Sequence, residues 1–283
     1  MYSVYFSIHW LKCNFIAWFY LKKDRHNNLI RFGSLEISEL MALSVIGEIK
    51  KVEEFLQGQA TSDISLLSNN NCQLSSICNH KGQVLADFIV YKINEEFKII
   101  INKNLKDTLI DELKPFAQFS SIEFKAGTEK IIGSISDQKD SSGVYNFNDE
   151  YQLKIELKPD TFVLKNEITF EEWAVANKFQ GILFLDKEDI EKYRPLEINF
   201  DKLRVSFDKG CYRGQEIVAR MKYLGIDRRK FCTFIAKDVF KGSSDIKILG
   251  KIVKIGNKKV FNAIVKKDLI NQILKLHDLE EVI

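Results

Sequence analysis

Residues 209–216 read Lys-Gly-Cys-Tyr-Arg-Gly-Gln-Glu, and this octet decides how the whole chain is interpreted. Cys211 lies between two glycines and beside two cations, Lys209 and Arg213. Glycine adopts backbone angles that other residues avoid, so we expect the octet to turn sharply and to expose Cys211. The cations, and the amides of a helix that begins at Gln215, favour the thiolate, which attacks, binds metal or exchanges with disulfides. A lone cysteine is more often a buried apolar residue, but the charged setting favours the reactive interpretation here.

The octet also resembles the signature of the YgfZ group of folate-binding proteins, relatives of the aminomethyltransferase (T-protein) of glycine cleavage. The local resemblance runs from Ser206 to Arg220. Further matches in the same order extend it over about residues 35–235: Phe55–Asp63 (FLQGQATSD), Cys78–Gly82 (CNHKG), and Gly181-Ile182 with Pro195-Leu196-Glu197. The octet is a highly specific match, and the FLQGQ run is a moderately specific one.

Hydrophobic periodicity predicts the main elements. Residues 51–57, 105–118 and 171–179 have helical spacing, and a further helix follows the octet over residues 215–222. Alternation and turn residues predict a hairpin from residues 73–77 and 84–92. Residues 230–236, 246–255 and 259–265 are rich in β-formers and indicate a small barrel or sandwich. Strands and helices mix without strict βαβ alternation, which favours an α+β fold.

The resemblance implies a more specific architecture, a T-protein-like ring of three subdomains with folate near a central channel and a C-terminal antiparallel β-barrel. The domains expected from it are an N-terminal extension (1–34), a folate-binding α+β region of two interleaved subdomains (35–205), the cysteine-motif loop and helix (206–229), and the small barrel (230–283).

Composition and charge narrow the class of protein. The chain has 283 residues, of which 45% are hydrophobic and 29% charged, as in soluble globular proteins. Residues 202–230 contain nine Lys/Arg against three Asp/Glu, a local charge of +6 in a chain of net charge +3. This points to an anionic partner, such as a folate polyglutamate tail, a carboxylated small molecule or RNA phosphate, or to a merely solvated helix face. We find no phosphate-binding Gly-rich loop, G-x-S-x-G elbow or H-E-x-x-H motif.

The cysteines and the N-terminal residues give information about the cellular compartment of the protein. Five cysteines without a C-x-x-C pair suggest neither a disulfide framework nor a metal site, and fit a reducing cytoplasm. Residues 1–33 are aromatic-rich, but polar residues interrupt them and cations follow them, which argues against a secretory signal and a membrane span. We expect an added helix or strand packed on the body, or a poorly ordered extension.

The resemblance also implies site residues. Cys211 is the candidate catalytic residue. The candidates for folate or anion binding are Lys209, Gly210, Tyr212, Arg213, Gly214, Gln215, Glu216, Arg220, Gln180 and Asp87. Within these, Glu216 and Arg220 have the spacing of a helical ion pair.

Two positions depart from the aminomethyltransferases. Their pair of aspartates after the turn corresponds to Ala86-Asp87, which retains one acid, and their pterin-anchoring acid falls in the run Phe179-Gln180-Gly181-Ile182, which has none. Gln180 or Glu197 is then the candidate anchor, and glycine-cleavage chemistry is not favoured.

The function that the resemblance implies is a folate-binding accessory protein for the assembly or maintenance of [4Fe–4S] enzymes. Its ligand is tetrahydrofolate or a derivative, and its partners are iron–sulfur client enzymes, such as radical enzymes that methylthiolate tRNA. We expect a cytoplasmic monomer with no membrane contact. The alternatives are a tetrahydrofolate-dependent aminomethyl or C1 transferase, and a basic RNA-binding module whose affinity would fall steeply with salt.

Overall fold

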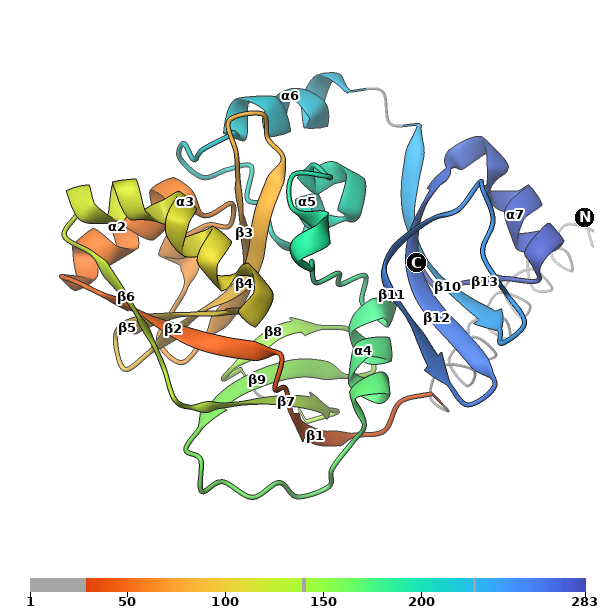
Figure 1. Cartoon of the computed structure of the whole chain (residues 1–283), viewed down its shortest axis with the longest axis horizontal. Helices are drawn as coiled ribbons and strands as arrows, with labels where there is room; N and C mark the ends of the chain where they lie inside the picture. Colours follow the sequence, from red (N-terminus) through yellow and green to blue (C-terminus); the bar gives the residue numbers. More distant parts are fainter. Residues whose placement is uncertain (1–28, 139–140, 226–227) are drawn as a thin grey trace, which may run out of the picture.

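The computed structural model describes residues 29–138, 141–225 and 228–283. Residues 1–28, which hold most of the expected N-terminal extension, lie outside this part of the chain. In the described part, thirteen strands form three antiparallel sheets, which Figure 1 shows arranged about helices α4 and α5. The α+β class is therefore confirmed.

The largest sheet has the order β3-β4-β5-β2-β6 and carries the predicted hairpin. Its strands are β2 (Leu40–Ile46), β3 (Cys72–Cys78), β4 (Val84–Ile93), β5 (Glu96–Asn102) and β6 (Glu123–Ala126). Helices α2 (Ile49–Gln59) and α3 (Lys106–Phe119) pack on it through buried faces that include Phe55 and Leu113. Helix α3 agrees with the predicted range 105–118 and continues past Pro115, because that residue faces solvent while Leu113 and Ala117, one turn apart, are buried.

The second sheet has the order β1-β7-β9-β8. It comprises β1 (Gly33–Glu36), β7 (Lys130–Ser136), β8 (Val144–Phe147) and β9 (Gln152–Lys158), and helix α4 (Phe170–Phe179) packs beside it. The chain enters this sheet at β1, leaves for the largest sheet at β2 and returns at β7. A capping box between Thr169 and Glu172 fixes the start of α4, which explains why the sequence placed this helix correctly.

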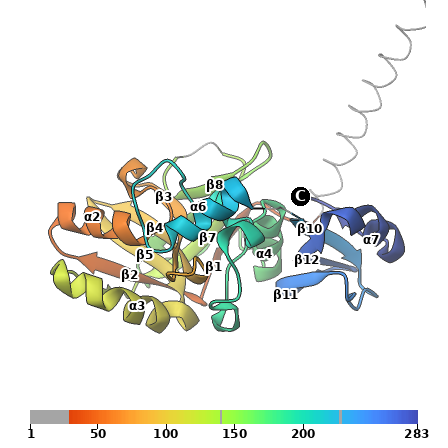
Figure 2. The same ribbon diagram turned by 90° about the horizontal axis from the view of Figure 1, so that it is seen from above.

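The C-terminal strands form an open sheet, so the expected C-terminal β-barrel was wrong. Its strands β11 (Lys247–Ile255), β12 (Lys258–Lys266), β10 (Arg229–Lys237) and β13 (Glu280–Glu281) form an open sheet with β11 and β13 at its edges. Three long strands and a two-residue fourth are too few to close on themselves. Helix α7 (Ile270–His277) covers one face instead, and Figures 1 and 2 show the sheet lying between α7 and α4.

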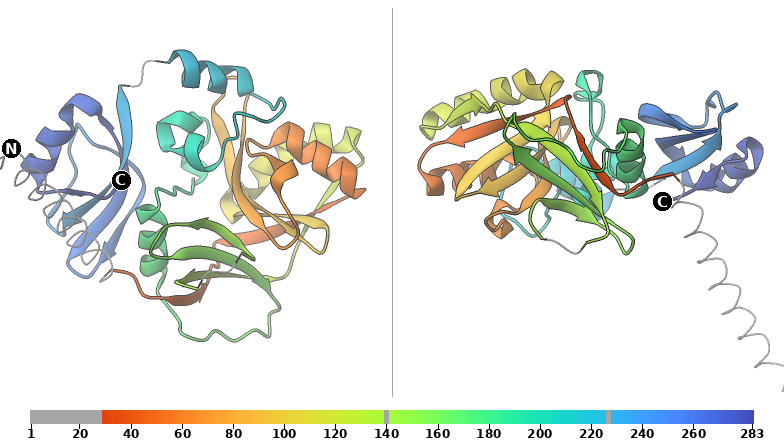
Figure 3. Two further views of the ribbon diagram at one scale, coloured as in Figure 1. Left: turned by 180° about the vertical axis from the view of Figure 1, so that it is seen from behind. Right: turned by 90° about the horizontal axis from the view of Figure 1, so that it is seen from below.

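Short helices complete the described part of the chain. Helices α5 (Phe200–Leu203) and α6 (Gln215–Leu224) flank the octet, and Figures 1 and 3 show α5 between α6 and α4. The 3-10 turns are η1 (Ile64–Leu66), η2 (Lys103–Leu105), η3 (Lys187–Asp189), η4 (Pro195–Ile198) and η5 (Lys267–Leu269). None of the helices that the structure describes has the length and apolar character needed to span a bilayer.

Candidate functional site

The octet is held at the C-terminal end of α2 by Lys209. This side chain is buried, and its Nζ donates to the carbonyl oxygens of Gln57, Ala60 and Ser62 at 2.7, 2.6 and 2.9 Å. The backbone N–H of Ser206 adds a bond to the Thr61 carbonyl oxygen at 3.0 Å. The octet and the FLQGQATSD run, which lie 150 residues apart in the sequence, therefore form one site. The Lys209 ammonium is engaged there and is not available to steer an anionic ligand.

The third stretch of the resemblance, the β3–β4 turn, contacts the octet at Gly214. Gly214 has φ +84°, and a Cβ built on it would lie 2.4 Å from the Asn79 carbonyl oxygen. Arg213 also reaches this turn, because its Nε donates to the Cys78 carbonyl oxygen at 2.8 Å. Gly210 differs from Gly214, since an added Cβ would meet nothing within 4 Å and its φ is not positive. Of the two glycines, only Gly214 has a backbone that a side chain would strain.

Cys211 projects from this framework. Of the four cysteines in the described part of the chain, it alone is exposed. Tyr212 beside it is buried, with its ring 5.3 Å from the Lys209 Nζ, and burial raises the pKa of its phenol. Arg213 pairs with Glu112 of α3 at 2.9 Å. The thiol is thus displayed on a loop whose neighbouring side chains are all fixed.

The helix after the octet begins at Gln215, as predicted, and Gly214 is its N-cap. Glu216 and Arg220 are exposed on α6, but no ion pair joins them among the described residues. Four of the nine cations of residues 202–230 pair with an acid: Arg204, Arg213, Lys222 and Lys230. Only part of the positive charge in the described residues of this segment is therefore free to meet an anionic partner.

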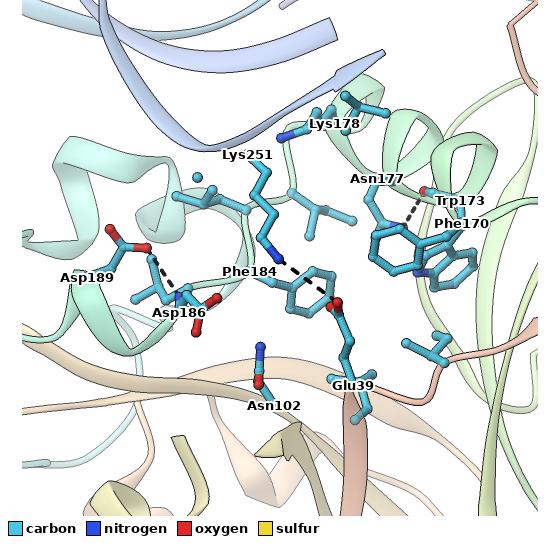
Figure 4. Close-up of a pocket in the computed structure, with 18 of the residues that line it drawn as sticks. Glu39, Asn102, Phe170, Trp173, Asn177, Lys178, Phe184, Asp186, Asp189 and Lys251 are labelled. Carbon is cyan, nitrogen blue, oxygen red and sulfur yellow. Dashed lines mark hydrogen bonds and ion pairs between the residues drawn. The ribbon is translucent and has the colours of Figure 1, made fainter. Parts of the chain in front are cut away.

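A second candidate site is a pocket between the three sheets, shown in Figure 4. Its space, including the open mouth, is about 930 Å³. Phe170, Trp173 and Phe184 give it aromatic walls, and Asn177 and Lys178 reach it from the same helix, α4. Polar groups from other elements complete the lining: Glu39, Asn102, Asp186, Asp189 and Lys251. No octet residue lines this pocket, so the structure holds two distinct candidate sites.

The two remaining predicted site residues lie between these sites. Asp87 is buried in β4, where its carboxylate pairs with Arg204 at 2.9 Å and accepts the Leu185 N–H at 3.0 Å. Burial raises the pKa of this carboxyl group. Gln180 ends α4 and donates from Nε2 to the Tyr151 carbonyl oxygen at 3.2 Å. Neither residue lines the pocket.

Sequence reasoning missed most of the pocket. The helix over residues 171–179 was predicted, but Lys178 was not singled out. A lysine on an otherwise buried stretch of α4 is the signal that could have found it. Glu39 and Lys251 come from the β1–β2 connection and from β11, and only the tertiary fold brings them within 4.0 Å of each other.

The fold and these sites place the chain in a known structural class. The glycine cleavage aminomethyltransferase T of Bartonella henselae superposes with a TM-score of 0.61, covering 86% of this chain and 81% of that protein at 15% identity. The chain therefore has the aminomethyltransferase T fold.

Relatives in sequence indicate which group of proteins with this fold the chain resembles. The tRNA-modifying protein YgfZ of Buchnera aphidicola is 29% identical over 236 residues, covering 72% of each chain. An uncharacterized protein of Haemophilus influenzae is 32% identical over 187 residues, covering 64% of this chain and 66%, just under two thirds, of that protein. No protein-family model matches the chain. The resemblance to the YgfZ group is confirmed, because the chain is similar to the YgfZ protein of Buchnera aphidicola over 72% of its length.

Proposed function

We propose that this chain is a folate-binding accessory protein that supports the assembly or maintenance of [4Fe–4S] enzymes, and through them the modification of tRNA. The observation that carries the proposal is the exposed Cys211 on a loop held by Lys209 and Gly214, where three stretches of the YgfZ resemblance meet. An accessible thiol on a fixed loop can bind iron transiently or exchange with a partner's oxidised sulfur. The YgfZ relatives are named tRNA-modifying proteins, which supports a role of this chain in tRNA modification. We propose that it acts in the cytoplasm.

The residues that line the pocket suit a folate chemically. Phe170, Trp173 and Phe184 offer flat apolar faces for a pterin or aminobenzoate ring. Lys178 and Lys251 can pair with glutamate carboxylates. Tetrahydrofolate would supply a reduced pterin that carries one-carbon groups, and these residues would bind and orient it.

The two alternative functions, aminomethyl or C1 transfer and direct RNA binding, have less support. Aminomethyl transfer needs a carboxylate near the reacting folate nitrogen, but Asp87 is buried against Arg204 and lies outside the pocket lining. Direct RNA binding needs free cations, and four of those near the octet are paired with acids. Neither arrangement favours these functions over an accessory role.

The proposal is tested in cells whose only copy of the gene encodes Cys211→Ala. We expect loss of 2-methylthio modification of tRNA and of one [4Fe–4S] dehydratase activity, with the protein present at its normal level. Asp208→Ala is the matched control, because Asp208 is exposed in the same loop. If both readouts stay normal in the Cys211 variant, the thiol has no part in iron–sulfur maintenance.

A further inference from the structure

Lys178 is a buried cation without a partner in the described part of the chain. Its side chain lies on the pocket wall, and the residue is 8% exposed, almost the same as the 7% of Lys209. Lys209 donates to three carbonyl oxygens, whereas the Lys178 Nζ has no hydrogen bond or ion pair among the described residues. A largely desolvated cation costs stability unless a polar partner meets it, so the position of this ammonium at an open pocket requires an explanation.

Hydrogen bonds to the backbone of Lys178 hold this residue in place beside the pocket. The residue lies in the last turn of α4, and its carbonyl oxygen accepts the Gly181 N–H at 2.9 Å. The same oxygen accepts the Thr233 hydroxyl of β10 at 2.8 Å, which ties α4 to the C-terminal sheet. Lys178 is therefore held at the contact between two packed elements, with its ammonium at the pocket.

The acids of the pocket are engaged with other groups. Glu39 pairs with Lys251 across the pocket at 4.0 Å, as Figure 4 shows. Asp186 accepts the Lys187 N–H and the Asn104 side-chain amide, and Asp189 accepts the Asp186 N–H. Desolvation lowers the pKa of Lys178 to about 8, so the group is still largely protonated at neutral pH and remains a donor. Among the described residues, none of the acids that line the pocket pairs with the desolvated Lys178 ammonium.

We propose that the Lys178 ammonium is the polar anchor of this pocket, donating to a carboxylate or carbonyl oxygen of a ligand whose flat ring packs against Phe170, Trp173 and Phe184. This inference rests on the proposed folate-binding function and specifies which end of the ligand is buried. A folate offers such an oxygen at two ends: the pterin carbonyl at one, and the amide carbonyl and carboxylates of the benzoylglutamate at the other.

The test is a calorimetric titration of the full-length protein and its Lys178→Met variant with 5-formyltetrahydrofolate. We expect the variant to bind on the order of tenfold to a hundredfold more weakly, since a hydrogen bond to a charged group is lost. Lys165→Met is the matched control, because Lys165 is exposed and its removal makes the same change in net charge. Lys178→Gln is a second variant, should the methionine variant fail to fold, and it is expected to weaken binding as well.

Two fragments identify the oxygen. 6-Methylpterin has the ring carbonyl without a carboxylate, and N-(4-aminobenzoyl)-L-glutamate has the carboxylates without the pterin. The fragment that binds more weakly to the Lys178 variants than to the unsubstituted protein contains the oxygen that accepts from Lys178. If the folded Lys178 variants bind 5-formyltetrahydrofolate as tightly as the unsubstituted protein, the anchor is wrong and the folate proposal stands. If the unsubstituted protein binds no folate, both the proposed folate binding and the proposed role of Lys178 are wrong.

Discussion

At the scale of single residues, two lysines with similar burial have opposite roles. Lys209 has all three of its donor directions matched by carbonyl oxygens and fixes the octet on α2. Lys178 has none matched in the described part of the chain and faces a pocket. Desolvation lowers the pKa of both to about 8. Burial alone therefore does not separate a structural lysine from a ligand-binding one, whereas hydrogen bonding does.

This difference predicts opposite effects on the free energy of unfolding without ligand. Lys178→Met removes an uncompensated buried cation and should stabilise the protein at pH 7 by up to about 3 kcal/mol. Lys209→Met leaves three carbonyl oxygens without their donor and should destabilise it by about 2–4 kcal/mol. Urea unfolding at pH 7 measures both values. A Lys178 variant less stable than the unsubstituted protein would show that the side chain serves packing.

The pH dependence of the Lys178 effect follows from the direction of its pKa shift. Its pKa is lower in the folded state than its ordinary value of 10.5, so the folded protein binds fewer protons between about pH 8 and 10.5. Stability contributed by this group therefore rises with pH across that window. The advantage of Lys178→Met should be largest below pH 8 and should shrink as the pH approaches 10.5. Subtracting the two unfolding curves at each pH isolates Lys178 from Lys209, which both proteins retain.

At the scale of elements, the octet depends on one close approach between a loop and a hairpin. Gly214→Ala places a Cβ 2.4 Å from the Asn79 carbonyl oxygen at a positive φ, so the loop must move away from the β3–β4 turn. We expect a loss of about 1–3 kcal/mol in the free energy of unfolding. Gly210→Ala is the matched control, because its Cβ meets nothing within 4 Å, and it should change stability by less than about 1 kcal/mol. Equal effects of the two substitutions would contradict this account.

The elements also show what the sequence could predict. Local signals were sufficient for the β3–β4 hairpin, for α4 with its cap, and for the helix that begins at Gln215. The contacts of Lys209 could not be predicted, because a lysine beside a glycine gives no sign of three carbonyl oxygens far away in the sequence. The barrel was wrong for a related reason, since whether edge strands such as β11 and β13 meet depends on the whole domain. The pocket unites residues from six elements and has no local signature.

At the scale of the whole molecule, a buried polar network connects the octet to the pocket. The Arg204 guanidinium donates to the Ser75 carbonyl oxygen at 3.1 Å. The Ser75 hydroxyl accepts the Ser62 hydroxyl at 2.8 Å, and the Ser62 carbonyl oxygen accepts the Lys209 Nζ of the octet at 2.9 Å. The Arg204 guanidinium pairs with Asp87 and donates to the Leu183 carbonyl oxygen at 3.0 Å, and Asp87 accepts the Leu185 N–H. Leu183 and Leu185 line the pocket. One ion pair thus supports the loop of Cys211 and the pocket wall together.

This network predicts that a single substitution affects both sites. Arg204→Met leaves Asp87 as a buried charge without its partner and should cost about 3–5 kcal/mol of the free energy of unfolding. Replacing both residues, as Arg204→Met with Asp87→Leu, removes the unpaired charge and should restore at least about 1 kcal/mol of the free energy of unfolding. Urea unfolding of the four proteins of the double-mutant cycle would show this.

The folded fraction of the Arg204→Met variant should also show a change at each site. Cys211 should react faster with a thiol reagent, and 5-formyltetrahydrofolate should bind more weakly, because the loop and the pocket wall both lose support. If stability falls but neither the thiol reaction nor the binding changes, the ion pair stabilises the core alone and the two sites are independent.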